Sequence, residues 1–135
     1  MIQQLIISKE YREAILAHVE RELPNEACGL LAGKNDRVEK VFLIPNQVQS
    51  PVRFVMDPYE QLQAFEWIDS HGLTLLGIFH SHPTGPETVS ATDIAEAAYD
   101  VVHIVCSRND GGWKIRGFSI ENGKAAEITL LLTDR

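Results

Sequence analysis

The feature that most constrains the fold is an almost entirely apolar run, Leu-Thr-Leu-Leu-Gly-Ile-Phe, at residues 73–79. It lacks the polar and apolar alternation of a strand that has one face in water, and it therefore predicts a strand covered on both faces. Neighbouring segments must supply that cover. The chain is expected to pack layers on both sides of a central sheet.

Three segments have the signals of helices that provide this cover. Residues 8–23 carry apolar side chains at helical spacing, which predicts a first helix. Asp57 as N-cap and Pro58 in the first turn predict a second helix that ends at Gly72. A third helix is expected over residues 90–99.

The other apolar segments are expected to be strands: 27–32, 38–44, a short one at 53–56, 101–106, and a closing hairpin of 113–120 with 125–132. Strands that alternate with helices in this order predict an α/β (α+β) fold, a mixed β-sheet flanked by helices. No repeat or Ser/Gly linker divides the chain, so residues 1–135 are expected to form a single domain.

Bulk properties exclude several classes of protein. The apolar start, residues 2–7, is too short for a signal peptide, and no apolar run reaches the length of a membrane span. A formal net charge of -7 argues against a nucleic-acid binder, because phosphate contacts need a clustered basic surface. Cys28 and Cys106 stand alone in apolar stretches, as buried free thiols do in a reducing compartment. We expect a cytoplasmic protein that binds neither nucleic acid nor membranes.

The covered strand leads into a candidate metal site. His80 and His82 are two residues apart, so their side chains lie on the same face of the strand and can converge on one ion. Asp93 follows a loop whose Pro and Gly residues can turn the chain back, and it is the candidate third ligand. Three protein ligands with an open position are typical of catalytic zinc, although other divalent metals remain open on ligand type alone.

Glu26 is the candidate general base, because it lies beside an apolar run where a carboxylate has no evident structural use. Two bland alternatives stay open: Glu26 as a surface carboxylate, and Ser90 with Asp93 as a helix capping box. Three further histidines, His18, His71 and His103, are expected to be packing or surface residues.

These residues together resemble the JAMM metalloproteases, also called the MPN-plus family. The family pattern is an upstream Glu, then His-x-His-Pro, six residues, and Ser-x-x-Asp. Here it reads Glu26, His80-Ser81-His82-Pro83 and Ser90-Ala91-Thr92-Asp93 without a gap or substitution. The resemblance covers nearly the whole chain and implies an MPN/JAMM, cytidine-deaminase-like domain.

The resemblance also implies a role for each residue of the pattern. His80, His82 and Asp93 would bind zinc, while Glu26 would deprotonate a water and pass the proton to the leaving amine. Ser90 would stabilise the oxyanion, sharing or losing its capping role. Ser81 is expected on the opposite side of the strand with at most a supporting role.

The implied function is a zinc-dependent metallopeptidase or isopeptidase. Residues 25–33 are similar to small bacterial members that release cysteine from the C-terminus of a ubiquitin-like sulfur carrier, so a carrier with a Gly-Gly tail is the expected partner. Such a tail needs an open groove, with the strands after Gly33 and near Arg53 as candidate walls. Arg53 is expected either to steer an acidic partner or to be simply exposed.

Other functions remain as alternatives to this one. A non-catalytic MPN-minus binding module and a hydrolase of a small amide would keep the same residues. A zinc nucleoside deaminase would need a Glu at the position of Ser81 and a Pro-Cys-x-x-Cys motif, which the chain lacks. The DNA-repair-associated RadC-like branch usually has Asn at that position, and the acidic charge disfavours it.

Overall fold

The computed structural model describes residues 2–134. Its elements are β1 (Gln4–Ser8), α1 (Lys9–Arg21), β2 (Cys28–Lys34), β3 (Arg37–Ile44), α2 (Pro58–Ser70), β4 (Thr74–His82), α3 (Ala91–Glu96), β5 (Val102–Asn109), β6 (Gly112–Glu121) and β7 (Lys124–Thr133). The strands form a closed barrel in the order β1-β3-β2-β4-β5-β6-β7. Within these residues no helix has the length and apolarity of a transmembrane span.

Closure of the sheet depends on β1, a strand that the sequence analysis did not predict. It lies parallel to β7, with Leu5 beside Leu130 and Ile7 beside Leu132, and it meets β3 at Ile6. Its burial alternates, with Leu5 and Ile7 fully buried. The predicted mixed sheet with helices is thus confirmed, but the sheet curls into a barrel because its first strand joins the closing hairpin.

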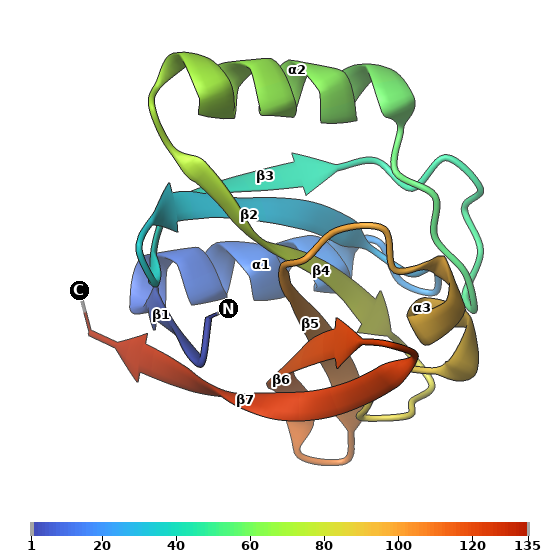
Figure 1. Ribbon diagram of the computed structural model, residues 1–135. Coiled ribbons are helices and arrows are strands. Elements are labelled where there is room, and N and C mark those ends of the chain that lie inside the picture. Colours follow the sequence, from blue (N-terminus) through green and yellow to red (C-terminus); the bar gives the residue numbers. More distant parts are fainter. Residues whose placement is uncertain (1, 135) are drawn as a thin grey trace.

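Two apolar clusters lie on opposite faces of this sheet. One gathers Ile15 and Val19 of α1 with residues of all the strands, and the other gathers Ala64 of α2 with Leu30 and Met56. Figure 1 shows α1 and α2 on either side of β2 and β3. In β4, Phe79 belongs to the first cluster and Ile78 to the second. The apolar run at 73–79 is therefore covered on both faces, as predicted.

The predicted start of α2 is confirmed, whereas the predicted strand at 53–56 and the predicted end of the third helix are wrong. Asp57 caps α2 through the amide of Glu60, with Pro58 in the first turn, as expected. Residues 53–56 form no strand, because the Asn46 side chain takes the backbone hydrogen bonds at positions 53 and 55 that a ladder would use, leaving one bridge at Met56. The third helix is shorter than predicted, since the backbone becomes extended at Ala97.

The strand β4 places the two histidines between two other strands. His80 lies opposite Cys28 of antiparallel β2 and Val105 of parallel β5. Because side chains alternate along a strand, His80 and His82 share the face of Ile78, on the side of the cluster beneath α2. The β2–β4 pairing thereby brings the start of β2 to the histidines.

Close approach of β2 and β4 requires a glycine at position 29. A Cβ atom on Gly29 would overlap the Phe79 ring and the backbone carbonyl oxygen of Phe42. The ring of Phe79 is fully buried and has no room to withdraw. Gly29 therefore allows the central strands to pack at this register.

Gly29→Ala is expected to lower the free energy of unfolding by about 1–3 kcal/mol, the usual cost of overpacking a core. Urea denaturation of both proteins measures the difference. Gly111→Ala is the matched control, because its Cβ would meet only the Asn109 side chain at 3.4 Å. Equal stability of Gly29→Ala and wild type would contradict the tight packing described here.

Candidate metal centre

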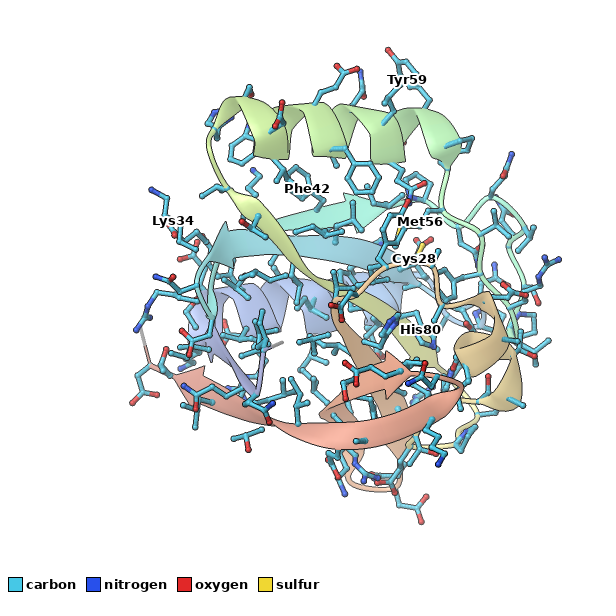
Figure 2. All side chains as sticks on the ribbon, in the orientation of Figure 1. Cys28, Lys34, Phe42, Met56, Tyr59 and His80 are labelled. Carbon is cyan, nitrogen blue, oxygen red and sulfur yellow. The ribbon has the colours of Figure 1, made fainter. Side chains whose placement is uncertain are left out.

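Three side-chain atoms converge at the end of β4. The Nε2 atoms of His80 and His82 are 2.9 Å apart, and Oδ2 of Asp93 lies 3.1 Å from each of them. Ligand atoms about 2.0–2.1 Å from a tetrahedral zinc would be about 3.3 Å from one another. The spacing of these atoms therefore fits a single metal ion. Figure 2 shows His80 near Met56 and Cys28, toward the end of the sheet that bears α3.

Neighbouring groups fix the orientation of both rings. Nδ1 of His82 is 2.8 Å from the carbonyl oxygen of Pro86, which only accepts hydrogen bonds. Nδ1 must then carry the hydrogen, and in the neutral ring the lone pair of Nε2 faces Asp93 and His80. The His80 ring stacks on Phe54 with centroids 4.7 Å apart. Both imidazoles are held in position before any ion binds.

The electrostatics of the three groups favour a cation. Burial lowers the pKa of His80, which keeps its ring neutral. Burial opposes ionisation of Asp93, but contacts with His80 and His82 outweigh it and hold the pKa of this carboxyl below its usual range. Burial likewise opposes protonation of His82, yet Asp93 and the Pro86 carbonyl raise its pKa. A buried negative charge facing imidazole nitrogens is satisfied by a metal ion or, in its place, by protons.

Glu26 is buried beside this group, with only 5% of its surface exposed, so the alternative of a surface carboxylate is wrong. One of its carboxylate oxygens lies within 4.8 Å of the ligand nitrogens of His80 and His82. Asp93 is closer to both rings, at 3.1 Å, which favours Asp93 as the third ligand, although Glu26, His80 and His82 also lie close enough together to hold a metal ion. Burial, reinforced by the charge of Asp93 and opposed by His82, raises the pKa of Glu26 to about 7.

The backbone around Glu26 is tied down on both sides. Its amide donates to the carbonyl of Ser50 at 2.8 Å, and its carbonyl accepts from Nδ2 of Asn46 at 3.0 Å. The next amide, that of Ala27, donates to Oγ of Ser81 at 2.8 Å. Ser81 thus lies on the opposite face of β4 from the histidines, as expected, and its hydroxyl joins this strand to the Glu26 segment.

Asn46 is a site residue that the sequence analysis missed. It is buried, and its Nδ2 donates to the carbonyls of Glu26 and Arg53, both at 3.0 Å. Its Oδ1 accepts from the amides of Val48 and Val55. One side chain therefore links the base candidate to the loop that holds Phe54 against His80. The only signal in the sequence is an asparagine after a proline, which indicates a turn and no more.

Ser90 and Asp93 form the capping box that the sequence left open as an alternative. Oγ of Ser90 accepts from the Asp93 amide at 3.0 Å, and Oδ2 of Asp93 accepts from the Ser90 amide at 2.8 Å. The same Oδ2 faces the two histidines. The cap therefore positions the carboxylate, and neither of these bonds uses the hydroxyl hydrogen of Ser90.

A cavity of about 230 Å³ lies beside His80. Its wall includes residues 52–56, Ile78, His80, Asp93 and His103. Arg53 is half exposed, and its side chain lies 4.0 Å from that of Glu96 across the wall. Of the two wall segments proposed from the sequence, the one near Arg53 lines this cavity, and the strand after Gly33 is not among its lining residues.

The remaining predicted side chains lie outside the metal centre. Cys28 and Cys106 are buried and free, as expected, and burial raises the pKa of each thiol to about 12, which leaves both unreactive. His71 lies at the surface, where it stacks on Trp67. His18 and His103 are both 8% exposed. Burial of His18 agrees with a packing role, since its ring meets Phe79 edge to face.

The family described as prokaryotic homologs of the JAB domain matches residues 8–119. The chain belongs to this family. The match spans both segments of the site pattern and most of the barrel, which confirms the family predicted from the sequence.

Several characterised relatives are similar over much of the chain. A probable TtuB-protein conjugate cleaving protease of Thermus thermophilus is 36% identical, with 94% of this chain and 83% of the relative covered. A desampylase of Pyrococcus furiosus is 46% identical over 67% of this chain and 64% of the relative. A CysO-cysteine peptidase of Mycobacterium tuberculosis is 31% identical over 91% and 87%. The predicted enzyme class, a JAMM-type hydrolase, is confirmed by these prokaryotic JAB relatives.

Solved structures agree on the fold. A protein from Desulfitobacterium hafniense superposes with a TM-score of 0.88 at 36% identity, covering 97% of this chain and 94% of that one. A JAB1/MPN domain protein from Archaeoglobus fulgidus superposes with a TM-score of 0.61 at 21% identity, covering 96% and 100%. The second likeness concerns the fold alone. The chain therefore has the JAB/MPN architecture.

Asn46→Asp is expected to lower the free energy of unfolding by about 1–3 kcal/mol, because two buried carbonyls lose their donor and face a carboxylate instead. Thermal and urea denaturation measure the loss. Asn109→Asp is the matched control, since the exposed Asn109 side chain acts as an acceptor for the Gly111 amide, a role that Asp retains. Equal losses in the two variants would contradict the linking role of Asn46.

Proposed function

We propose that this chain is a zinc-dependent metallopeptidase that hydrolyses a peptide or isopeptide bond at the C-terminal tail of a ubiquitin-like or sulfur-carrier protein. The observation that carries the proposal is the convergence of His80, His82 and Asp93 within 3.1 Å of one another. A buried carboxylate, Glu26, stands beside them with its pKa raised to about 7 by burial. Every ligand and the base that the proposal needs therefore have a candidate residue at this site.

The names of the relatives support the substrate class. One relative is named a probable TtuB-protein conjugate cleaving protease, another a desampylase, and a third a CysO-cysteine peptidase. The cavity beside His80 also supports a tail substrate, because it lies directly next to the candidate ligands. We extend the chemistry of these relatives to this chain as a proposal.

In this proposal His80, His82 and Asp93 hold the metal, and we assign zinc from the mixed nitrogen and oxygen donors. When bound, zinc supplies Lewis acidity, which polarises a carbonyl and makes water more acidic. The protein's own contribution is to hold the donors rigidly. Pro86 orients His82, Phe54 stacks on His80, and the Ser90 amide holds Asp93.

Glu26 is proposed as the general base and later the general acid. A base is most effective when its pKa lies near the working pH, and burial brings the pKa of this carboxyl to about 7. Glu26 would take a proton from the attacking water and return it to the leaving amine. Its backbone is fixed by Asn46 and Ser50, so the carboxylate is positioned for both transfers.

Ser90 is proposed to stabilise the oxyanion. In the capping box its Oγ accepts a hydrogen bond, which leaves its own O–H to be donated. Donation to the charge that develops on the carbonyl oxygen stabilises the transition state more than the ground state. Capping and catalysis therefore use different parts of the same hydroxyl.

Three further expectations stay proposals. We propose that residues 1–135 act as one domain, since a single barrel and the segments that connect its strands carry every candidate site residue. We propose a cytoplasmic location, in keeping with two buried free thiols. We also retain a cytidine-deaminase-like relationship of the fold as a proposal based on the sequence resemblance.

Removal of a ligand is expected to abolish tight metal binding. His80→Ala, His82→Ala and Asp93→Asn should each weaken zinc affinity by about 100-fold or more, beyond the ~10–100-fold cost of losing a group that only supports a ligand. Asn keeps an acceptor for the Ser90 amide, so it isolates ligand loss from cap loss. Chelator should lower the melting temperature of wild type only. Full zinc occupancy of Asp93→Asn by elemental analysis would refute this ligand set.

Glu26→Gln should retain zinc and lose about 10²–10⁴-fold in turnover, the usual contribution of general acid–base catalysis. The base must be ionised to act, so wild-type kcat/KM should fall as the pH drops through the pKa of Glu26. That midpoint is expected at or below about 7, because a neighbouring cation favours the carboxylate. A pH–rate profile measures it. Turnover of Glu26→Gln within threefold of wild type would remove Glu26 from the mechanism.

The substrate is tested with a folded ubiquitin-like carrier whose Gly-Gly end is extended by one cysteine. Intact mass should show loss of that cysteine with zinc present and none with chelator. Binding of the folded carrier helps to position its tail, so a free dipeptide should be a poor substrate. Efficient cleavage of unrelated unfolded peptides with the carrier left intact would replace this proposal by a general peptidase.

A further inference from the structure

His103 lies in the wall of the cavity beside the candidate metal centre. The proposed mechanism does not use its buried Nε2 atom. The side chain lines the cavity and is 8% exposed. Within residues 2–134 its Nε2 is buried and has no hydrogen-bond partner. Buried polar atoms are nearly always paired, so an unpaired one at a cavity wall indicates a missing partner.

The hydrogen-bonding state of the ring follows from its other nitrogen. Against burial, which lowers the pKa of the His103 ring, the backbone of Tyr99 lies near the ring and raises it. Because Nε2 has no partner, we assign this contact to Nδ1, which then carries the hydrogen since a carbonyl only accepts. Burial lowers the pKa of His103, so the ring stays neutral. Its Nε2 therefore presents a lone pair that can accept a hydrogen bond.

No group among the described residues donates a hydrogen bond to Nε2 of His103. The polar side chains of the wall also include Gln61, Thr92 and Tyr99. Arg53 and Glu96 form an ion pair with each other, and Asp93 faces the two metal-ligand histidines. Much of the remaining wall is apolar, including Phe54, Met56 and Ile78. A ligand that enters the cavity would thus meet much carbon surface, a few polar side chains and the unpaired Nε2 of His103.

The position of His103 limits which part of a substrate can reach it. His103 of β5 is paired with Ile78 of the parallel strand β4. It lies on the same face of the sheet as His80, which follows Ile78 by two residues in β4. Strand spacing of about 4.8 Å and a rise of about 3.3 Å per residue separate the Cα atoms of His80 and His103 by about 8 Å. A tail spans about 3.3–3.6 Å per residue, so the atom near His103 lies about two residues from the scissile bond.

We propose that Nε2 of His103 accepts a hydrogen bond from a backbone N–H of the Gly-Gly segment on the acyl side of the scissile bond, which makes His103 a substrate-binding residue. The proposal rests on the proposed peptidase function. The acyl side is assigned because Glu26, which serves the leaving amine, is not part of the cavity wall. Glycine has no side-chain donor, so an acceptor for its backbone is a direct means of recognising it.

Two substitutions separate the two nitrogens of the ring. His103→Asn keeps a donor at the Nδ1 position for Tyr99 and removes the Nε2 acceptor, whereas His103→Gln places an amide oxygen near the Nε2 position. Loss of one hydrogen bond is expected to raise KM for the extended carrier about threefold to tenfold in His103→Asn. The kcat should stay within twofold. His103→Gln should restore most of the KM.

A substrate change tests the bond from its other end. Replacing each glycine N–H of the tail in turn by an ester oxygen removes the donor and keeps the chain geometry. At one of the two positions the ester should raise KM about threefold to tenfold for wild type and have little further effect on His103→Asn. The ¹⁵N chemical shift of Nε2 in metal-free Glu26→Gln should also move when the carrier is added, a readout independent of turnover.

Each outcome decides a separate question. A carrier that wild type neither binds nor cleaves would overturn the proposed function and, with it, the ligand named for His103. Cleavage by wild type with unchanged KM in His103→Asn, equal ester effects in both proteins and an unmoved ¹⁵N shift would overturn the role of His103 alone. Lower stability of His103→Asn with an unchanged KM would assign the ring a structural role instead.

Discussion

The antiparallel pairing of β2 with β4 determines where the groups of the site lie. The Ser81 amide donates to the Ala27 carbonyl at 3.0 Å, and the Ala27 amide donates to Oγ of Ser81 at 2.8 Å. These bonds hold the Glu26 segment beside the histidine strand, while alternation along β4 turns His80 and His82 to the face opposite Ser81. A shift of one residue would move both rings into the core that Phe79 occupies. Gly29 permits this register because it leaves room for the Phe79 ring.

The third candidate ligand is placed by a different mechanism, a local one. Asp93 stands in the first turn of a helix of six residues, which is too short to be stable by itself. The capping box with Ser90 holds that turn, and it directs Oδ2 toward the histidines. The hydrogen bonds that cap this helix therefore also position the candidate ligand. For this reason, a substitution at Ser90 or Asp93 changes both helix capping and the site.

What the sequence could predict reflects how local each signal is. The helix start at Asp57 and Pro58 and the two-sided cover of 73–79 depend on residues within one element, and both predictions hold. The strand β1 was missed because it has only five residues and no flanking turn signal. The alternating burial of its side chains becomes evident only when it is paired with β7. Asn46 was missed because its importance comes from contacts with positions 26, 53 and 55, which no spacing reveals. The ligand and base candidates came from residue type and spacing, the oxyanion role of Ser90 came from the resemblance, and the structure adds the proximity of these residues.

The proximity of two carboxylates, those of Asp93 and Glu26, links the proposed metal binding to the protonation state of Glu26. Asp93 keeps its charge through contacts with His80 and His82, and that charge adds to burial in raising the pKa of Glu26 to about 7. Around neutral pH, Glu26 without a neighbouring cation is thus partly protonated. In the proposed mechanism, a divalent cation held by the other three groups would stabilise its ionised form and lower this pKa. The negative charge of Asp93, proposed to attract the metal, would therefore also keep Glu26 partly protonated until a metal binds.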